Sequence, residues 1–180
     1  MSEIKQHTAY EQLLDKVDLF NERVQAAQGQ WLSCHRGCTE CCRTQRTAWP
    51  VELDYIRKYL AQVPPELLKR LRARRQTPEI RDGAQCIFLA EDGACDVYEV
   101  RPVICRTHGP VVRVDEGDLA WCDLNFDTPQ AHEVISQLRE DSILNLGLLN
   151  GMLALINRQF CQEQPNWERA PLETTLDQES

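Results

Sequence analysis

Residues 34–42 read Cys-His-Arg-Gly-Cys-Thr-Glu-Cys-Cys, and this stretch defines the centre around which the rest of the chain must fold. It holds four of the nine cysteines in a chain of 180 residues. Four more stand at positions 86, 95, 105 and 122, and the ninth is Cys161. Thiolates are soft ligands that select zinc, copper(I) and iron–sulfur clusters. The concentration of eight cysteines within residues 34–122 therefore predicts a metal or cluster site.

The spacing inside this stretch indicates more than one metal atom. Cys38-Thr-Glu-Cys41 is a CxxC motif, in which one turn lets two sulfurs reach one metal, and Cys34 adds a third candidate upstream. Cys42 follows Cys41 directly, and the side chains of adjacent residues usually diverge. We therefore expect this pair either to need an unusual loop or to serve two metal atoms, as in a polynuclear or two-site centre.

A short hairpin is expected over residues 86–98, because Asp92-Gly93 is a favoured turn pair. A turn at these two residues sets Cys95 opposite Ala90, about 13 Å from Cys86 along an ideal ladder. One zinc ion cannot bridge that distance. Either the hairpin is irregular or Cys86 and Cys95 bind different metal atoms.

The last three cysteines differ in their expected roles. Cys105 should lie on a single helical turn that begins near Pro102, whereas Cys161 sits among apolar residues and is expected in the core. Cys122 stays open between a ligand and a structural thiol. The candidate metal ligands are Cys34, Cys38, Cys41, Cys42, Cys86, Cys95, Cys105 and Cys122.

Composition narrows the class of protein. An odd number of cysteines, with no basic and apolar leader in residues 1–16, disfavours a disulfide framework and predicts a cytoplasmic protein. Mean hydropathy is −0.48 and no apolar run reaches membrane-spanning length, so we expect no membrane partner. The net charge of −8 argues against nucleic-acid binding, for which the basic stretch 69–81 is the one hint. A solvated helix face is the preferred interpretation of that stretch.

Helical periodicity predicts a mainly α fold, with long helices at both ends packed around an irregular cysteine-rich centre that contains short β-hairpins. Shorter helices are expected from Pro50 and over residues 66–76, and a second hairpin around Glu116-Gly117. Thr128-Pro129 should start one long helix that continues to residue 160. The apolar stripe of the first helix comprises Tyr10, Leu13, Leu14, Val17, Phe20 and Val24.

The predicted organisation is one metal-binding domain over residues 1–162, followed by an acidic and flexible tail over residues 163–180. Apolar residues cover two faces of the helix expected over 130–160. Such a helix is either buried in the core or shared with a second copy of the chain. Packing on residues 8–28 is the preferred interpretation, and a homodimer is the alternative.

Separated blocks of the sequence, in the right order, resemble a bacterial cysteine-cluster family that is described as a zinc- or iron-chelating domain and named for its CxxCxxCC motif. The resemblance implies metal chelation by the cysteines of these blocks. Related cysteine blocks occur in flagellin lysine N-methylases, in which an iron–sulfur centre and S-adenosylmethionine are implicated. The matching residues are Cys38-Thr-Glu-Cys41-Cys42, Cys86-Ile-Phe-Leu, Asp92-Gly-Ala-Cys95-Asp-Val-Tyr98-Glu and Arg101-Pro-Val-Ile-Cys105-Arg106.

Three polar residues beside the cysteines are candidates for binding a cofactor. Arg101 and Arg106 flank Cys105, and guanidinium groups could stabilise an anionic thiolate cluster or bind an anionic substrate. The alternative for Arg101 is an ion pair with a nearby carboxylate. His108, like His35, could replace a thiolate or stay in the surroundings of the centre.

These patterns lead to two functional hypotheses. The first is a redox, sensing or metal-handling module that holds an iron–sulfur or other polynuclear iron or zinc centre. An iron–sulfur cluster is the first choice of cofactor and zinc the second, because eight thiolates exceed what one zinc ion needs. The alternative is a small metalloenzyme that modifies a protein or RNA substrate. The sequence leaves open whether the protein is an enzyme, and no acid–base pair stands out.

Overall fold

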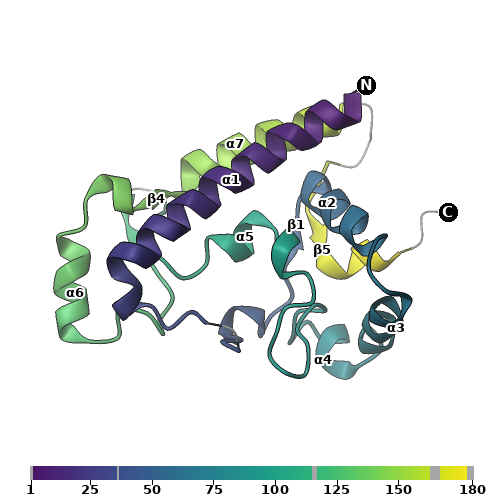
Figure 1. The fold of residues 1–180 in the computed structure, drawn as a ribbon, viewed down its shortest axis with the longest axis horizontal. Coiled ribbons are helices and arrows are strands. Elements are labelled where there is room, and N and C mark those ends of the chain that lie inside the picture. Colours follow the sequence, from purple (N-terminus) through teal and green to yellow (C-terminus); the bar gives the residue numbers. More distant parts are fainter. Residues whose placement is uncertain (1, 36, 115–116, 163–166, 178–180) are drawn as a thin grey trace.

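The computed structural model describes residues 2–35, 37–114, 117–162 and 167–177, with only the backbone of residues 2–8. The fold is mainly helical with short strands, as the sequence predicts (Figure 1). The helices are α1 (Ser2–Gln28), α2 (Pro50–Leu60), α3 (Pro65–Arg74), α4 (Pro78–Arg81), α5 (Val103–Arg106), α6 (Pro129–Ser136) and α7 (Leu146–Phe160). The strands are β1 (Thr47–Ala48), β2 (Val112–Arg113), β3 (Leu119–Ala120), β4 (Leu144–Asn145) and β5 (Ala170–Pro171). Single 3₁₀ turns are η1 (Gly29–Trp31), η2 (Glu40–Cys42), η3 (Tyr98–Val100), η5 (Glu140–Ser142) and η6 (Leu172–Leu176).

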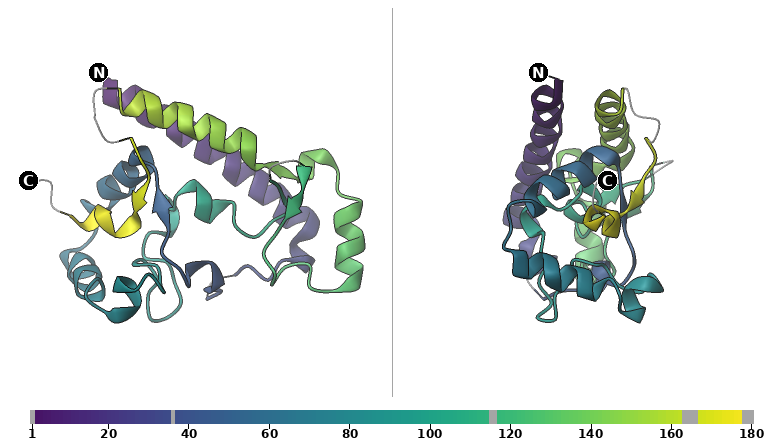
Figure 2. Two further views of the ribbon diagram at one scale, coloured as in Figure 1. Left: turned by 180° about the vertical axis from the view of Figure 1, so that it is seen from behind. Right: turned by 90° about the vertical axis from the view of Figure 1, so that its right-hand side faces the viewer.

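The first and last long helices lie side by side along one edge of the molecule (Figure 2). Every member of the predicted apolar stripe of α1 is buried. Leu149 and Leu153 of α7 join Tyr10 and Val17 of α1 in one apolar cluster. Removing these side chains from water is the main force that holds the two helices together. The predicted pairing of the two ends of the chain is therefore confirmed.

The long helix predicted from Thr128 to residue 160 is wrong, because the chain breaks it into two helices. The start is as expected, since the Thr128 hydroxyl accepts a hydrogen bond from the Ala131 N–H. α6 then ends at Ser136, and β4 pairs in parallel with β2. The Asn145 side chain caps α7 by accepting from the Leu148 N–H at 2.9 Å. A strand pairing and a helix cap thus compete successfully with helical propensity in residues 137–145.

A second apolar cluster lies under α2 and α3 and includes the C-terminal segment. β5 pairs antiparallel with β1, so that Ala170 lies opposite Ala48. Leu172 and Leu176 of η6 are buried in this cluster together with Ile56 of α2. The segment that the sequence assigns to a flexible tail therefore packs on the core over residues 170–176. Two leucines four residues apart on one 3₁₀ segment supply the apolar surface that secures it.

A three-stranded sheet lies on one side of the cysteine-rich centre. β2 pairs antiparallel with β3 and parallel with β4, in the order β3-β2-β4. This confirms a hairpin over residues 112–120, although Glu116 of its expected turn lies outside the described residues. A small cluster of Val111, Phe126 and Ile135 packs between this hairpin and α6.

Two surface features bear on the expected partners. Leu148 and Leu155 of α7 are 65% and 64% exposed, and a homodimer through this helix stays a prediction.

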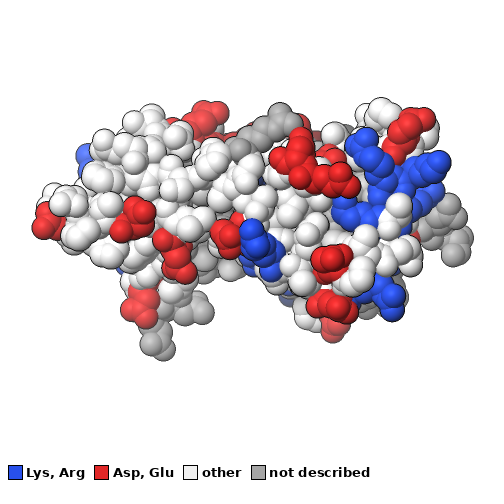
Figure 3. Space-filling view, turned by 90° about the horizontal axis from the view of Figure 1, so that it is seen from below, with Lys and Arg blue, Asp and Glu red and all other residues white. Residues whose placement is uncertain are grey.

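Figure 3 shows blue side chains gathered at the end of the molecule where Figure 1 places α3. Arg74 and Arg75 of that helix form ion pairs with Asp96 and Asp177, as the interpretation of a solvated basic face allows. Among the described helices, none combines the length and apolarity that crossing a membrane requires.

Candidate metal centre

The adjacent cysteines of the first loop point in similar directions rather than apart. η2 is a 3₁₀ turn, closed by the Cys42 N–H donating to the Thr39 carbonyl at 2.8 Å. Its tight winding places the Cys41 and Cys42 sulfurs 3.9 Å apart. The Arg46 guanidinium fixes this turn by donating to the Cys41 carbonyl at 3.0 and 3.1 Å. The local structure thus supplies the unusual loop that the sequence requires for both thiols to serve one centre.

The segment that carries Cys86 and Cys95 docks directly on this loop. The Cys86 N–H donates to the Cys42 carbonyl at 2.8 Å. Residues 86–89 then form a turn, because the Leu89 N–H donates to the Cys86 carbonyl at 3.1 Å. Leu89 rather than Ala90 is paired with Cys95 across the hairpin. The hairpin is therefore irregular, and the separation expected for an ideal ladder does not apply.

The turn of this hairpin touches the first loop. Gly93 has a positive φ of 78°, and a Cβ at this position would lie 3.1 Å from the Gly37 Cα. A side chain here would meet both backbone strain and a tight contact. Glycines at 37 and 93 thus let the two cysteine-bearing segments approach closely.

Cys105 approaches the same centre from α5. Burial raises the pKa of the Cys105 thiol to about 12, and the charges of Cys95 and Cys41 act in the same direction. The guanidinium groups of Arg101 and Arg46 oppose this rise. Cys105 therefore lies within electrostatic reach of these two thiols and two cations.

The charge of Cys41 acts on several of the other thiols. It raises the pKa values of Cys34, Cys86 and Cys95, although burial is the largest cause in each case. The pKa of Cys41 itself is raised by its hydrogen bond with Cys42 and by burial, and Arg46 opposes both. Together with the hydrogen bond from the Cys86 N–H to the Cys42 carbonyl, these effects show that cysteines distant in the sequence lie within electrostatic reach of the first loop.

Backbone N–H groups also face two of these thiols. The Phe88 N–H lowers the pKa of Cys86, and the Val97 N–H lowers that of Cys95, each against the larger effect of burial. In both pairs the donor stands two residues after the cysteine. A donor aimed at sulfur favours the thiolate, which is the form that binds metal.

Cys34 is held by a buried amide from the far end of the motif. The Asn125 side chain, 1% exposed as a residue, accepts from the Ser33 N–H at 2.8 Å and donates to the Gly109 carbonyl at 2.7 Å. Its Nδ2 also donates to the Cys34 sulfur at 3.5 Å. Partial burial raises the pKa of Cys34, and this hydrogen bond opposes the rise. A Cβ at Gly109, whose φ is 126°, would lie 2.8 Å from the same sulfur.

The remaining cysteines fall on either side of the centre. The charges of Cys122 and Cys38 both act to raise the pKa of Cys34, with burial the largest cause, so both thiols are within electrostatic reach of it. Cys161 is buried at the end of α7 and its sulfur contacts the Asn157 amide oxygen at 3.7 Å, as expected for a core thiol.

The candidate cofactor-binding residues separate into different environments. Arg106 pairs with Asp18 of α1 at 2.5 Å, so its charge serves packing of α5 on α1. Arg101 stacks on the Tyr98 ring at 3.6 Å and also faces Cys95 and Cys105. Burial, with a smaller effect of Arg46, lowers the pKa of His108. A neutral imidazole is thus favoured at pH 7.

The fit of a metal to these residues rests on donor chemistry and on one distance. Zinc–sulfur bonds of about 2.3 Å in a tetrahedron place two sulfurs about 3.8 Å apart. The 3.9 Å between the Cys41 and Cys42 sulfurs matches that edge. In the part of the chain that the structure describes, no three His, Cys, Asp or Glu side chains are placed to hold a metal ion. The donor set fits a soft metal, although the described side chains do not form a coordination shell.

Two residues of this site were not singled out from the sequence. Arg46 follows the cysteine pair closely, and a lone arginine there carries no recognisable motif. Asn125 lies 91 residues from Cys34, so no local pattern could have linked the two. Both act on the cysteines through hydrogen bonds that exist only after the segments meet.

The hydrogen bond between Ser33 and Asn125 joins the two ends of a stretch of chain that matches a known domain family. Residues 33–125, just over half of the chain, match the family model CxxCxxCC, described as "Putative zinc- or iron-chelating domain". The chain belongs to the CxxCxxCC family. The resemblance of the cysteine blocks is thereby confirmed, and chelation of zinc or iron by the protein is the chemistry that the family description supplies. Searches of curated proteins and of solved structures found no match.

Proposed function

We propose that this member of the CxxCxxCC family holds an iron–sulfur cluster, or another polynuclear iron or zinc centre, and acts as a redox, sensing or metal-handling module. The observation that carries the proposal is geometric: the Cys41 and Cys42 sulfurs lie 3.9 Å apart, on a loop to which the Cys86 N–H donates a hydrogen bond. The proposed ligands are the eight cysteines from Cys34 to Cys122. When bound, such a centre would supply one-electron transfer or a regulated metal store.

The residues around the thiols support the binding of a centre that carries negative charge. Arg46 and Arg101 both lower the pKa of Cys105, so each favours its thiolate. The Phe88 and Val97 N–H groups do the same for Cys86 and Cys95. Burial opposes ionisation of these thiols and favours their protonated form. A bound cation would stabilise the thiolates and so offset the free-energy cost of burying their negative charge.

The test is anaerobic purification followed by an absorption spectrum and analysis for iron, sulfide and zinc. Iron with acid-labile sulfide and a broad visible band supports the cluster. A colourless protein with stoichiometric zinc would replace the first choice by the second. A protein that binds neither metal would contradict the proposed function altogether.

Single substitutions assign the ligands. Cys41→Ala and Cys42→Ala should each abolish or strongly weaken metal binding, because both sulfurs face the centre. Cys161→Ala is the matched control, since its thiol is buried against Asn157 and away from the motif. Retention of metal by Cys41→Ala and its loss from Cys161→Ala would overturn the assignment.

A metalloenzyme is the second candidate, favoured by one observation. A cavity of about 260 Å³ lies beside Cys122 and His108, two residues next to the proposed centre. A pocket at a metal site is the arrangement that a substrate needs. Turnover of a bound small molecule by the metal-loaded protein, and loss of turnover in a metal-free preparation, would distinguish an enzyme from a module that only stores or senses.

A further inference from the structure

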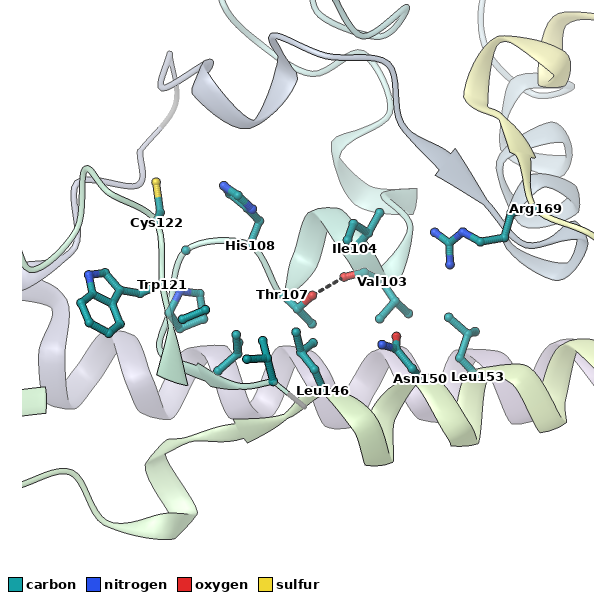
Figure 4. Close-up of a pocket in the computed structure, with 15 residues that line it drawn as sticks. Val103, Ile104, Thr107, His108, Trp121, Cys122, Leu146, Asn150, Leu153 and Arg169 are labelled. Atoms are coloured by element: carbon teal, nitrogen blue, oxygen red, sulfur yellow. Dashed lines mark hydrogen bonds between the residues drawn. The ribbon is translucent and has the colours of Figure 1, made fainter. Parts of the chain in front are cut away.

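The cavity beside the centre is lined mainly by apolar side chains (Figure 4). One wall is formed by Val103 and Ile104 of α5, and the floor by Leu146 and Leu153 of α7. Ala120 of β3 closes a third side. Its volume of about 260 Å³ lies just below the roughly 300–1,000 Å³ of pockets for drug-sized ligands. The cavity therefore suits a small molecule with an apolar body.

Polar groups stand at the two ends of this cavity. Figure 4 shows the Cys122 and His108 side chains projecting on the same side at one end. At the other end the Arg169 guanidinium extends from the β5 side toward the cavity, with the Asn150 amide below it. A ligand that fills the space would thus meet a cation at one end and the surroundings of the cysteine centre at the other.

Arg169 is fixed in this position by contacts with the segment around β1. Its Nε donates to the Thr47 hydroxyl at 3.2 Å and its Nη2 to the Thr47 carbonyl at 2.6 Å. Its guanidinium also lies 5.5 Å from the centre of the Trp49 ring. Among the described residues, Nη1 has no hydrogen-bonded partner. A held guanidinium with an open edge is a preorganised site for an anion.

The Glu52 carboxyl group lies within electrostatic reach of Arg169 and is already hydrogen-bonded. Arg169 lowers the pKa of Glu52, although burial raises it more. The Glu52 carboxyl oxygens accept from the Trp49 N–H at 2.8 Å and the Val103 N–H at 2.9 Å. Both oxygens are therefore turned to backbone donors, and the open edge of Arg169 stays available to a ligand.

We propose that this cavity binds a small organic carboxylate, with its carboxylate on Arg169 and its apolar body directed toward Cys122 and His108. This proposal names the class of ligand that binds beside the proposed metal centre. Its relation to the metal rests on the proposed function. Occupancy of the cavity itself depends on Arg169 and the apolar walls.

The experiment uses the full chain, metal-free and metal-loaded, titrated with hexanoate and with its neutral counterpart hexanamide and followed by NMR shifts or calorimetry. We expect hexanoate to bind saturably and about 10-fold more tightly, the usual gain from one charge-assisted hydrogen bond. Arg169→Gln should remove that preference while keeping hexanamide binding, which also shows that the cavity is intact.

Two further variants complete the design. Ala120→Phe should weaken both ligands, because the ring occupies the space that they need. Arg158→Gln, an exposed arginine of α7 that does not line the cavity, should leave both affinities unchanged. Metal content and spectrum, measured on the same preparations, should be the same in all three variants.

Several results would overturn the proposal. They are the absence of saturable binding, equal affinity for the two ligands in the unmodified protein, and a hexanoate preference that survives in Arg169→Gln. A protein that binds hexanoate as expected but contains no metal keeps the carboxylate site and contradicts the proposed function instead.

Discussion

Asn125 offers the sharpest test of how the tertiary structure supports the cysteine centre. Asn125→Ala removes an acceptor from the exposed Ser33 N–H, which water can replace, and one donor from the Gly109 carbonyl. That carbonyl keeps a second donor, the Cys122 N–H at 3.3 Å. We therefore expect the alanine variant to lose about 1–2 kcal/mol of unfolding free energy.

Asn125→Asp should cost more although it is nearly isosteric. The new carboxylate keeps the bond from the Ser33 N–H but places an oxygen where Nδ2 lies 2.7 Å from the Gly109 carbonyl and 3.5 Å from the Cys34 sulfur. An unpaired buried charge costs about 3 kcal/mol or more. Loss of the donor to a ligand sulfur should also lower metal affinity by about 10–100-fold.

The assay is urea unfolding of the metal-free protein, combined with competition for zinc against a chromophoric chelator. Asn145→Asp is the matched control, because Asn145 only accepts a hydrogen bond at the start of α7 and Asp serves equally well there. A smaller loss in Asn125→Asp than in Asn125→Ala would refute the donor role of this amide. So would an aspartate variant as stable and as metal-binding as the control.

Three other predictions follow from paired sites. Arg74→Met should destabilise the protein by about 3 kcal/mol in urea unfolding, because the side chains of Arg74 and Asp96 are only 14% and 12% exposed. Arg75→Met should cost less than about 1 kcal/mol, because the side chains of Arg75 and Asp177 are 35% and 54% exposed. Gly109→Ala should weaken zinc binding, because the new methyl group would displace the Cys34 sulfur. Gly117→Ala, with φ at 94° and open space around it, should change stability alone. Equal zinc affinities of the two variants would contradict the close approach of Gly109 to Cys34. Burial raises the pKa of Glu52, so the unfolded state loses this proton first and stability falls as pH rises above about 4.3. In Glu52→Gln that fall should be shallower, and identical pH profiles in urea unfolding would contradict it.

The helices show where sequence patterns are reliable. The stripe from Tyr10 to Val24 is local, strongly periodic and buried throughout, and it predicts α1 correctly. Residues 137–145 are different, because pairing of β4 with β2 and the Asn145 cap involve partners that a helical period does not reveal. The segment from Ala170 to Leu176 is short and flanked by polar residues, so only its contacts with β1 and α2 give it a place.

The same distinction between local pattern and tertiary contact applies to the cysteine site. The motif itself identifies the ligand chemistry and the candidate residues, because the softness of a thiolate belongs to the side chain wherever it lies. The distance between Cys41 and Cys42 was not predictable from their adjacency, since it depends on the winding of η2. The relation of Cys86 to Cys95 likewise depended on a turn at residues 86–89 in place of a regular strand.

The sequence by itself therefore determined which residues can bind a soft metal, which family the cysteine blocks resemble and which helices form at the two ends of the chain. Only the tertiary structure decided that the Cys41 and Cys42 sulfurs lie 3.9 Å apart, that Asn125 holds Cys34, and that Arg169 reaches the cavity beside Cys122. The physical reason is that donor softness and helical periodicity are properties of residues and of short spacings. A hydrogen bond across 91 residues exists only when burial of the apolar clusters has brought its two ends together.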